Sequence, residues 1–348
     1  MNPPVPFFPR RKFIKTAMTA SAAALIAPYV RSGEKSGTRL PVVGESGHNY
    51  ECIHDWGRLP PGLAYGVTHG VVQDAAGCIY IMQRPHATSA LRDAVVVYEP
   101  SGRFIRSWGS EYQAGAHGLH LAWENGQEYF YLADPVLREV IKTTLTGEIV
   151  WRRGCPFESG CYQSVEGYKP TNIATAPDGT VFVADGYGSN YIHIYGPDGS
   201  YVKTFGGTGN KLGQLDCPHG ILVDTRGPKP LLVVADRRNH RLHYFSLSGE
   251  PLHLVDQELR LPCHFHQREG MLLIPDLQSR VSLFDRDNRL ITHLGDGGDF
   301  KGIRDQPRSA FTPGKFVAPH SAIFDRDGNI FVVEWVEVGR VTKLRRIT

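Results

Sequence analysis

The sequence predicts an all-β protein: a single six-bladed β-propeller over residues 49–348. Three observations lead to this prediction: a repeated unit, the turns inside that unit, and the way the last repeat ends. The unit recurs six times, and each copy has about 45–55 residues, the size of a four-stranded propeller blade. Glycine-containing turns precede most of the apolar second strands. These second strands fall at 79–82, 130–134, 181–185, 232–236, 272–276 and 330–334.

The sixth unit stops at Arg346 after three strands. Its missing fourth strand is predicted at the other end of the chain, in residues 49–57, which share the pattern of the fourth strands at 103–109 and 200–206. Borrowing this N-terminal strand closes the ring and removes an exposed sheet edge.

The first 33 residues are predicted to be an export signal. Arg10, Arg11 and Lys12 precede a short, mildly apolar stretch at 16–27, which resembles a twin-arginine signal read by export machinery. The alternative is a basic tail. Residues 34–48 are expected to be a linker, and the mature protein is expected in the periplasm or outside the cell. No apolar run reaches the roughly 18 residues that a transmembrane helix requires.

The charge distribution argues against nucleic-acid binding. The chain carries a formal charge of +3, but residues 1–33 contribute five basic residues and no acid. The predicted propeller therefore has a net charge of −2, without the basic field that nucleic acid requires.

Histidines recur where the blades begin. The first strand of each blade lines the central channel, so equivalent residues at the strand starts converge on one mouth of that channel. Five of the six equivalent positions are histidine, in a chain with only 15 histidines: His69, His117, Asn172, His219, His264 and His320.

Three of these histidines belong to alternate blades and are related by about 120° around the axis. His117, His219 and His320 would leave an open fourth position, which is typical of a catalytic zinc site. The alternative for each is a hydrogen-bonded core histidine. His69, Asn172 and His264 are candidates for additional pocket residues.

The second strands end at the same mouth, because neighbouring strands are antiparallel. They place Arg84, Tyr187 and Arg237 there. Two guanidinium groups can hold a substrate carboxylate, and a phenol whose pKa is lowered by a nearby cation can act as a base. The alternative is that these side chains are solvated or pair with a neighbouring blade.

The quoted residues resemble the NHL-repeat propellers, and more specifically the peptidyl-α-hydroxyglycine α-amidating lyases. The segments that carry this resemblance are Val234–Leu242, Pro218–Ile221, Ala184–Tyr187 and Pro319–His320. The resemblance implies a zinc ion held by His117, His219 and His320, with Tyr187 as the base. It also implies substrate contacts from Arg84 and Arg237, and a structural calcium held partly by the backbone carbonyls of Val71 and Leu119.

Three departures bear on this transfer. The family has an aspartate that binds the calcium where this chain has Ser321, so a calcium site is doubtful. Ala318 replaces a methionine, and Gly188 stands where the family has a disulfide cysteine. Cys155 and Cys161 form a separate candidate disulfide, because export favours oxidation and they lie close together in one loop.

The leading hypothesis is a zinc-dependent lyase that cleaves a C–N bond in a small, α-hydroxylated, carbinolamide-like substrate with a carboxylate. One alternative is a metal-dependent lactonase or esterase, which the scarcity of acidic residues at the blade starts disfavours. Another is a non-catalytic NHL propeller that binds a protein or small ligand. Fold alone does not separate these hypotheses.

Overall fold

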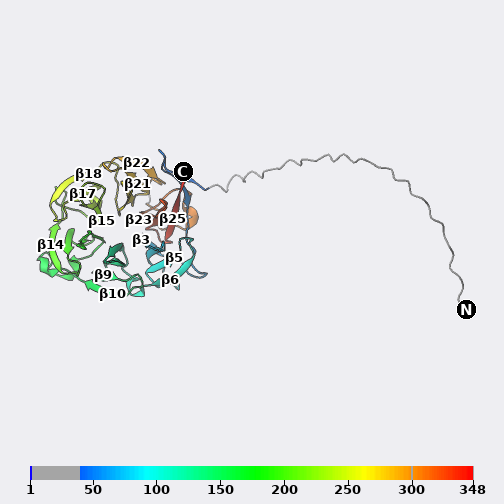
Figure 1. Ribbon diagram of the computed structural model, residues 1–348, viewed down its shortest axis with the longest axis horizontal. Helices are drawn as coiled ribbons and strands as arrows, with labels where there is room; N and C mark the ends of the chain where they lie inside the picture. Colours follow the sequence, from blue (N-terminus) through cyan, green and yellow to red (C-terminus); the bar gives the residue numbers. More distant parts are fainter. Residues whose placement is uncertain (2–39, 299–300, 348) are drawn as a thin grey trace. The chain divides into compact units, whose positions relative to one another are not determined.

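The structure is a computed structural model that describes residues 1, 40–298 and 301–347. The predicted export signal lies outside the described residues apart from Met1. Six antiparallel sheets stand around a ring, with β3, β15 and β23 near its centre (Figure 1). The predicted six-bladed propeller is therefore confirmed.

Five blades are meanders of four strands that follow one another in the chain. Their strands are β3 (Val67–Gln73), β4 (Ile79–Arg84), β5 (Val95–Tyr98) and β6 (Phe104–Trp108) in blade 1; β7 (Gly118–Glu124), β8 (Gln127–Asp134), β9 (Glu139–Thr143) and β10 (Ile149–Arg153) in blade 2; β11 (Asn172–Thr175), β12 (Val181–Ala184), β13 (Tyr191–Tyr195) and β14 (Tyr201–Gly206) in blade 3; β15 (Pro218–Asp224), β16 (Leu231–Asp236), β17 (Arg241–Phe245) and β18 (Pro251–Val255) in blade 4; and β19 (His266–Arg268), β20 (Met271–Asp276), β21 (Arg280–Phe284) and β22 (Leu290–Leu294) in blade 5.

The sixth blade closes the ring as predicted. It joins β23 (Pro319–Phe324), β24 (Ile330–Glu334) and β25 (Arg340–Ile347) to β2 (Asn49–Ile53) from the other end of the chain. Residues expected in the linker also contribute, since β1 (Val42–Val43) pairs with β2 as a fifth strand. The closure is reinforced by Trp56, whose ring centroid lies 4.6 Å from that of Phe331.

Burial explains the strand sequences. The second strands pack against neighbouring blades on both faces, so they are continuous apolar runs, as in β12, where every residue is buried. The fourth strands lie at the rim, and β10 is largely exposed. Helical structure in the described residues consists of five 3-10 turns: η1 (Ser110–Tyr112), η2 (Phe157–Ser159), η3 (Val165–Gly167), η4 (Arg237–Asn239) and η5 (Arg308–Ala310). No helix among these residues is long and apolar enough to cross a membrane.

The carboxylates at the ends of the second strands are structural. Asp185 is fully buried and accepts hydrogen bonds from the backbone N–H groups of Lys169 and Ser189. Glu334 likewise accepts from the N–H groups of Val317 and Ala318. Each carboxylate therefore ties the end of a second strand to the loop that leads into the first strand, which fixes where the blade-start residues lie.

The candidate disulfide in the loop between blades 2 and 3 is absent. All six cysteines fall within the described residues and are free. Cys155 and Cys161 lie on either side of η2, and this turn holds the Cys161 thiol against the Ser159 carbonyl oxygen at 3.7 Å. The turn geometry thus directs the Cys161 sulfur toward the backbone.

Candidate metal centre

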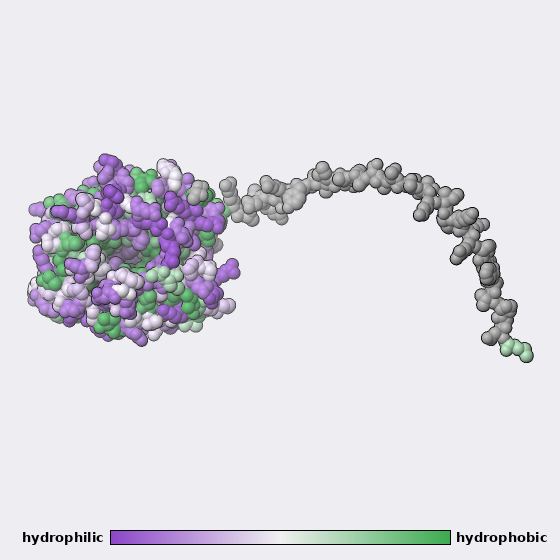
Figure 2. Space-filling view, in the orientation of Figure 1, coloured by the Kyte–Doolittle hydropathy of each residue, from purple (hydrophilic) through white to green (hydrophobic). Residues whose placement is uncertain are grey.

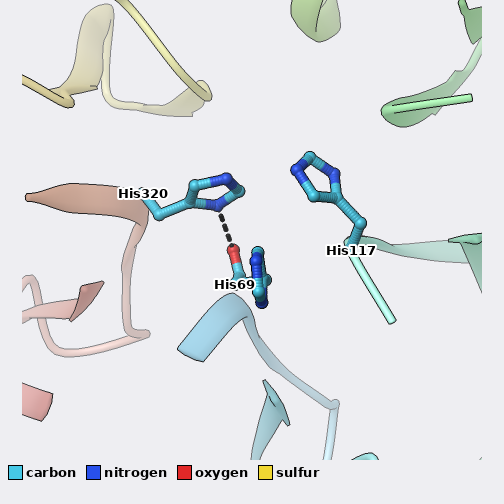
Figure 3. Close-up of side chains that lie close together, drawn as sticks. All are labelled: His69, His117 and His320. Carbon is cyan, nitrogen blue, oxygen red and sulfur yellow. Dashed lines mark hydrogen bonds between the residues drawn. The ribbon is translucent and has the colours of Figure 1, made fainter. Parts of the chain in front are cut away.

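The three histidines predicted to hold a metal converge in the channel. The ring centroids of His117, His219 and His320 lie 4.8 Å apart in each of the three pairs. All three side chains are buried. Figure 3 shows His117 and His320 facing one another across the channel, with His69 between them. We call His117, His219 and His320 the upper cluster.

One hydrogen-bond pattern orients all three rings. The Nδ1–H groups donate to a backbone carbonyl of the following blade at 2.8 Å, in the pairs His117–Thr171, His219–Cys263 and His320–His69. Blades 2, 4 and 6 thus supply imidazoles, and blades 3, 5 and 1 supply the carbonyls. Such a bond fixes the neutral tautomer and leaves Nε2 as the ligand atom, the usual outer-shell arrangement of metal-binding histidines.

Local backbone features aim these rings. The strand register shifts between Pro218 and Ile221 in blade 4 and between Pro319 and Ser321 in blade 6. Bulges of this kind turn a side chain out of the regular alternation and are frequent beside functional sites.

The glycine after two of these histidines has a specific packing role. A Cβ on Gly118 would lie 2.5 Å from the Thr171 carbonyl oxygen, and a Cβ on Gly220 would lie 2.5 Å from that of Cys263. These are the carbonyls that accept from His117 and His219. The missing side chain therefore lets the neighbouring blade approach closely enough to orient the ring.

His69 is a fourth histidine at the same place. His69, His117 and His320 each offer a ligand atom, and these atoms lie within 4.8 Å of one another. The Nδ1 of His69 is buried without a hydrogen-bond partner among the described residues. We favour the upper cluster as the principal ligand set because its three members share one orienting bond, with His69 beside it.

The surroundings keep these imidazoles neutral, which is the form that binds metal. Burial, and then His320 and Arg84, hold the pKa of His117 well below its ordinary value. Burial and then Arg237 do the same for His219, and burial lowers the pKa of His320 to about 3.

Tyr187 lies directly over two of the ligand atoms. Its hydroxyl is 3.1 Å from His117 Nε2 and 2.9 Å from His219 Nε2. Because both histidines carry their proton on Nδ1, each Nε2 presents a lone pair to the Tyr187 hydroxyl. The hydroxyl has only one proton to donate, so one Nε2 acceptor is left over, and a cation would satisfy it. Burial raises the pKa of the Tyr187 phenol, and Arg237 partly opposes this, so a lowered pKa at Tyr187 depends on a bound cation.

Both predicted arginines lie near the cluster. The Arg237 guanidinium lies 5.4 Å from the centroid of the Tyr187 ring. It also contacts the sulfur atoms of Cys217 at 3.2 Å and Cys263 at 3.8 Å. Arg84 donates from Nε to the Ala116 carbonyl at 3.3 Å. The contacts of Arg84 and Arg237 among the described residues are with a carbonyl oxygen, sulfur atoms and an aromatic ring, so both can receive an anion.

Two of the additional pocket candidates make other contacts. Asn172 is buried and its Oδ1 accepts from the backbone N–H of Ile173 at 2.8 Å. His264 lies deeper in the channel, with its Nδ1 3.3 Å from Ser321 Oγ. The sequence could not reveal this, because β19 begins only at His266 and the Cys263 carbonyl takes the position beside His219.

The residues at the implied calcium position do not fit calcium. Ca²⁺ requires several oxygen ligands, usually including carboxylates. Here the hydroxyl of Ser321 contacts His264, and the cavity that Leu119 lines has no acidic residue in its wall. A calcium site at this position is therefore not supported.

Fold and site together define a six-bladed propeller with a candidate metal centre at one mouth of its channel. In sequence, the chain is similar to peptidyl-glycine alpha-amidating monooxygenase of Mus musculus, with 28% identity over 162 residues, which are 44% of this chain and 16% of the relative. It is similar to peptidyl-alpha-hydroxyglycine alpha-amidating lyase 1 of Drosophila melanogaster, with 27% identity over 172 residues, 46% of this chain and 30% of the relative. The resemblance to amidating enzymes is thus confirmed. The chain matches less than a third of the length of these curated relatives, and no family model matches it.

Solved structures agree on the fold. A streptogramin B lyase superposes with a TM-score of 0.58 at 12% identity, covering 84% of this chain and 97% of the other. The virginiamycin B lyase of Staphylococcus aureus gives 0.56 at 12% identity, covering 86% and 100%. These structures support the propeller fold.

Proposed function

We propose that this protein is a metal-dependent lyase that breaks a C–N bond in a small α-hydroxylated, carbinolamide-like substrate bearing a carboxylate. The observation that carries the proposal is the Tyr187 hydroxyl, within hydrogen-bond distance of Nε2 of both His117 and His219. A potential base and the ligand atoms thus face the same small volume.

The upper cluster would hold the metal, and zinc suits three neutral imidazoles with an open position. When bound, zinc would supply Lewis acidity that lowers the pKa of a hydroxyl group. The histidines themselves need no rearrangement of protons, because each already carries its proton on Nδ1.

The chain's own residues account for the remaining steps. Tyr187 would take the proton from the substrate hydroxyl. The electron pair of the O–H bond becomes the carbonyl π bond, the C–N bond breaks, and its electrons leave with the amide nitrogen, which takes up a proton. Arg237 and Arg84 would hold the carboxylate, because they lack carboxylate partners among the described residues and lie beside Tyr187 and the histidines.

The test is the turnover of an N-acyl-α-hydroxyglycine by the Tyr187→Phe variant. We expect kcat to fall by about 100-fold or more, the usual size of a lost general base, with metal content unchanged. Tyr129→Phe is the matched control, because its hydroxyl contacts only Gln127 at the surface. Full turnover by Tyr187→Phe with metal bound would overturn the mechanism. Failure of the native protein to turn over any such substrate would favour a binding propeller.

Export through the N-terminal twin-arginine-like segment is also proposed. It would place the enzyme in the periplasm or outside the cell.

A further inference from the structure

A second group of histidines lines the channel beyond the upper cluster. His120, His264 and His266 lie in the wall of a cavity of about 370 Å³, together with Gln73 and Gln267. We call this cavity the lower chamber. Its other walls are aliphatic and aromatic side chains, including Leu121, Leu222, Phe265 and Ile323. Figure 2 shows that the ring is hollowed at its centre, with both polar and apolar surface around the hollow.

His266 has a hydrogen-bonding role that the backbone fixes. The backbone N–H of Phe324 donates to its Nδ1 at 3.3 Å, so the neutral ring carries its proton on Nε2. Within the described part of the chain no acceptor bonds that Nε2–H. The lower chamber therefore contains a hydrogen-bond donor that lacks a protein acceptor.

The other two histidines can adapt to a ligand. His120 Nε2 lies 2.9 Å from Thr175 Oγ1, and His264 Nδ1 lies 3.3 Å from Ser321 Oγ. A hydroxyl can donate or accept by rotating, so the second nitrogen of His120 can take either role. His264 also bonds the backbone of Ala322, so it is held more firmly. The two glutamines cannot adapt in this way. The side-chain amides of Gln73 and Gln267 are already fixed, because each bonds backbone groups through both its oxygen and its nitrogen.

The charge of the wall selects the ligand. The lining contains no aspartate, glutamate, lysine or arginine. Burial lowers the pKa of His120 and His264 to about 4 and that of His266 to about 3, so the rings are neutral near pH 7. A cation or anion buried here would thus lack a compensating charge. A neutral polar group needs no such charge, only a hydrogen-bond partner.

We propose that the lower chamber binds a small uncharged carbonyl compound, such as a primary amide with a short hydrocarbon body. The carbonyl oxygen accepts from His266 Nε2–H, the amide N–H groups donate to His120 or His264, and the hydrocarbon body packs on Leu121, Leu222 and Phe265. The cavity is at the lower end of the size range of small-molecule sites, which suits a ligand of few atoms. This inference does not rest on the proposed lyase activity.

The experiment is a titration of the full-length protein with acetamide, propionamide and benzamide, and with the matched acetate, propionate and benzoate. It is followed by NMR of ¹⁵N-labelled histidines. We expect saturable binding of at least one amide, with shifts at His120, His264 and His266. Affinity should fall by about tenfold or more in His266→Phe, since a buried hydrogen bond is lost.

His253→Phe is the matched control, because His253 lies on the exposed strand β18. It should bind as the native protein does. Binding should also persist in His117→Ala/His219→Ala, which separates it from the metal centre. If His266→Phe does not fold, His120→Gln provides the same comparison, with weaker binding expected. Tighter binding of the carboxylates, shifts confined to the upper cluster, or no saturable binding of any amide would each overturn the proposal.

Discussion

The upper cluster and the lower chamber are two histidine groups in one channel, and they differ in how the backbone holds them. In the upper cluster every Nδ1–H donates to a carbonyl of the next blade, and the rings converge at 4.8 Å. In the lower chamber the partners differ from ring to ring: a threonine, a serine and a backbone N–H. The residue type is shared, but the upper-cluster histidines are buried whereas His120, His264 and His266 are half-buried. The orienting bond and the deeper burial together separate a metal-binding arrangement from a cavity wall.

The largest expected effect is a loss of stability on acidification, to which the histidines of both groups contribute. In metal-free protein we expect the free energy of unfolding to fall as the pH drops from 6.5 to 4. The unfolded chain binds protons there, whereas the folded histidines, with pKa values of about 3–4, do not. Each such histidine contributes about 1.4 kcal/mol per pH unit.

Urea unfolding at several pH values measures this effect. His266→Gln should reduce the slope by about one proton, whereas His253→Gln at the surface should change it less. Asp185 has the opposite effect on the pH dependence of stability, because burial raises its pKa to about 6. Histidines with a lowered pKa outnumber it, since His54, His193 and His243 belong to this group as well. Stability that rises on acidification would contradict the assignment of neutral buried rings.

The glycine beside the upper cluster offers the next largest effect. Gly220→Ala places a Cβ 2.5 Å from the Cys263 carbonyl oxygen, which must then move away from His219. We expect a loss of about 2–3 kcal/mol in the free energy of unfolding, from overpacking. Metal affinity should also fall by about 10–100-fold, the usual effect of losing an outer-shell partner.

Gly154→Ala is the control for this substitution, since nothing lies within 4 Å of its Cβ. Chemical unfolding and competition with a chelator measure the two quantities. If Gly220→Ala bound metal as tightly as the native protein, the carbonyl contact would not be what orients His219.

The smallest expected effect concerns calcium. The midpoint of thermal unfolding should stay the same with calcium or with a calcium chelator, because the lower-chamber wall has no acidic residue and Ser321 contacts His264. Differential scanning calorimetry in both conditions tests this. A stabilisation that saturates with calcium would show that the carbonyls of Val71 and Leu119 suffice for a site.

Repetition made much of the fold predictable. The recurrent second strands gave the blade count, and the three-stranded sixth unit pointed to residues 49–57, within which the closing strand β2 occupies Asn49–Ile53. The blade-start pattern likewise indicated His117, His219 and His320, which the structure brings together.

What the pattern missed depends on contacts between blades. A register shift at His219 or His320 leaves no mark in composition, and the late start of β19, which places His264 in the lower chamber, could not be inferred from the spacing. His120 lies inside β7 and His266 is the first residue of β19, and neither position has a distinguishing sequence pattern. The backbone carbonyls that orient the upper cluster carry no sequence signal, except the glycines that let them approach.

The most direct test of the central claim is elemental analysis of folded protein purified without added metal. The native protein and a His120→Ala/His266→Ala variant of the lower chamber should each contain about one zinc or other transition-metal ion per chain, as for a single three-histidine site. The His117→Ala/His219→Ala variant should contain none. Absence of metal from the native protein even after zinc or cobalt is offered, or metal retained by the upper-cluster variant, would contradict the account.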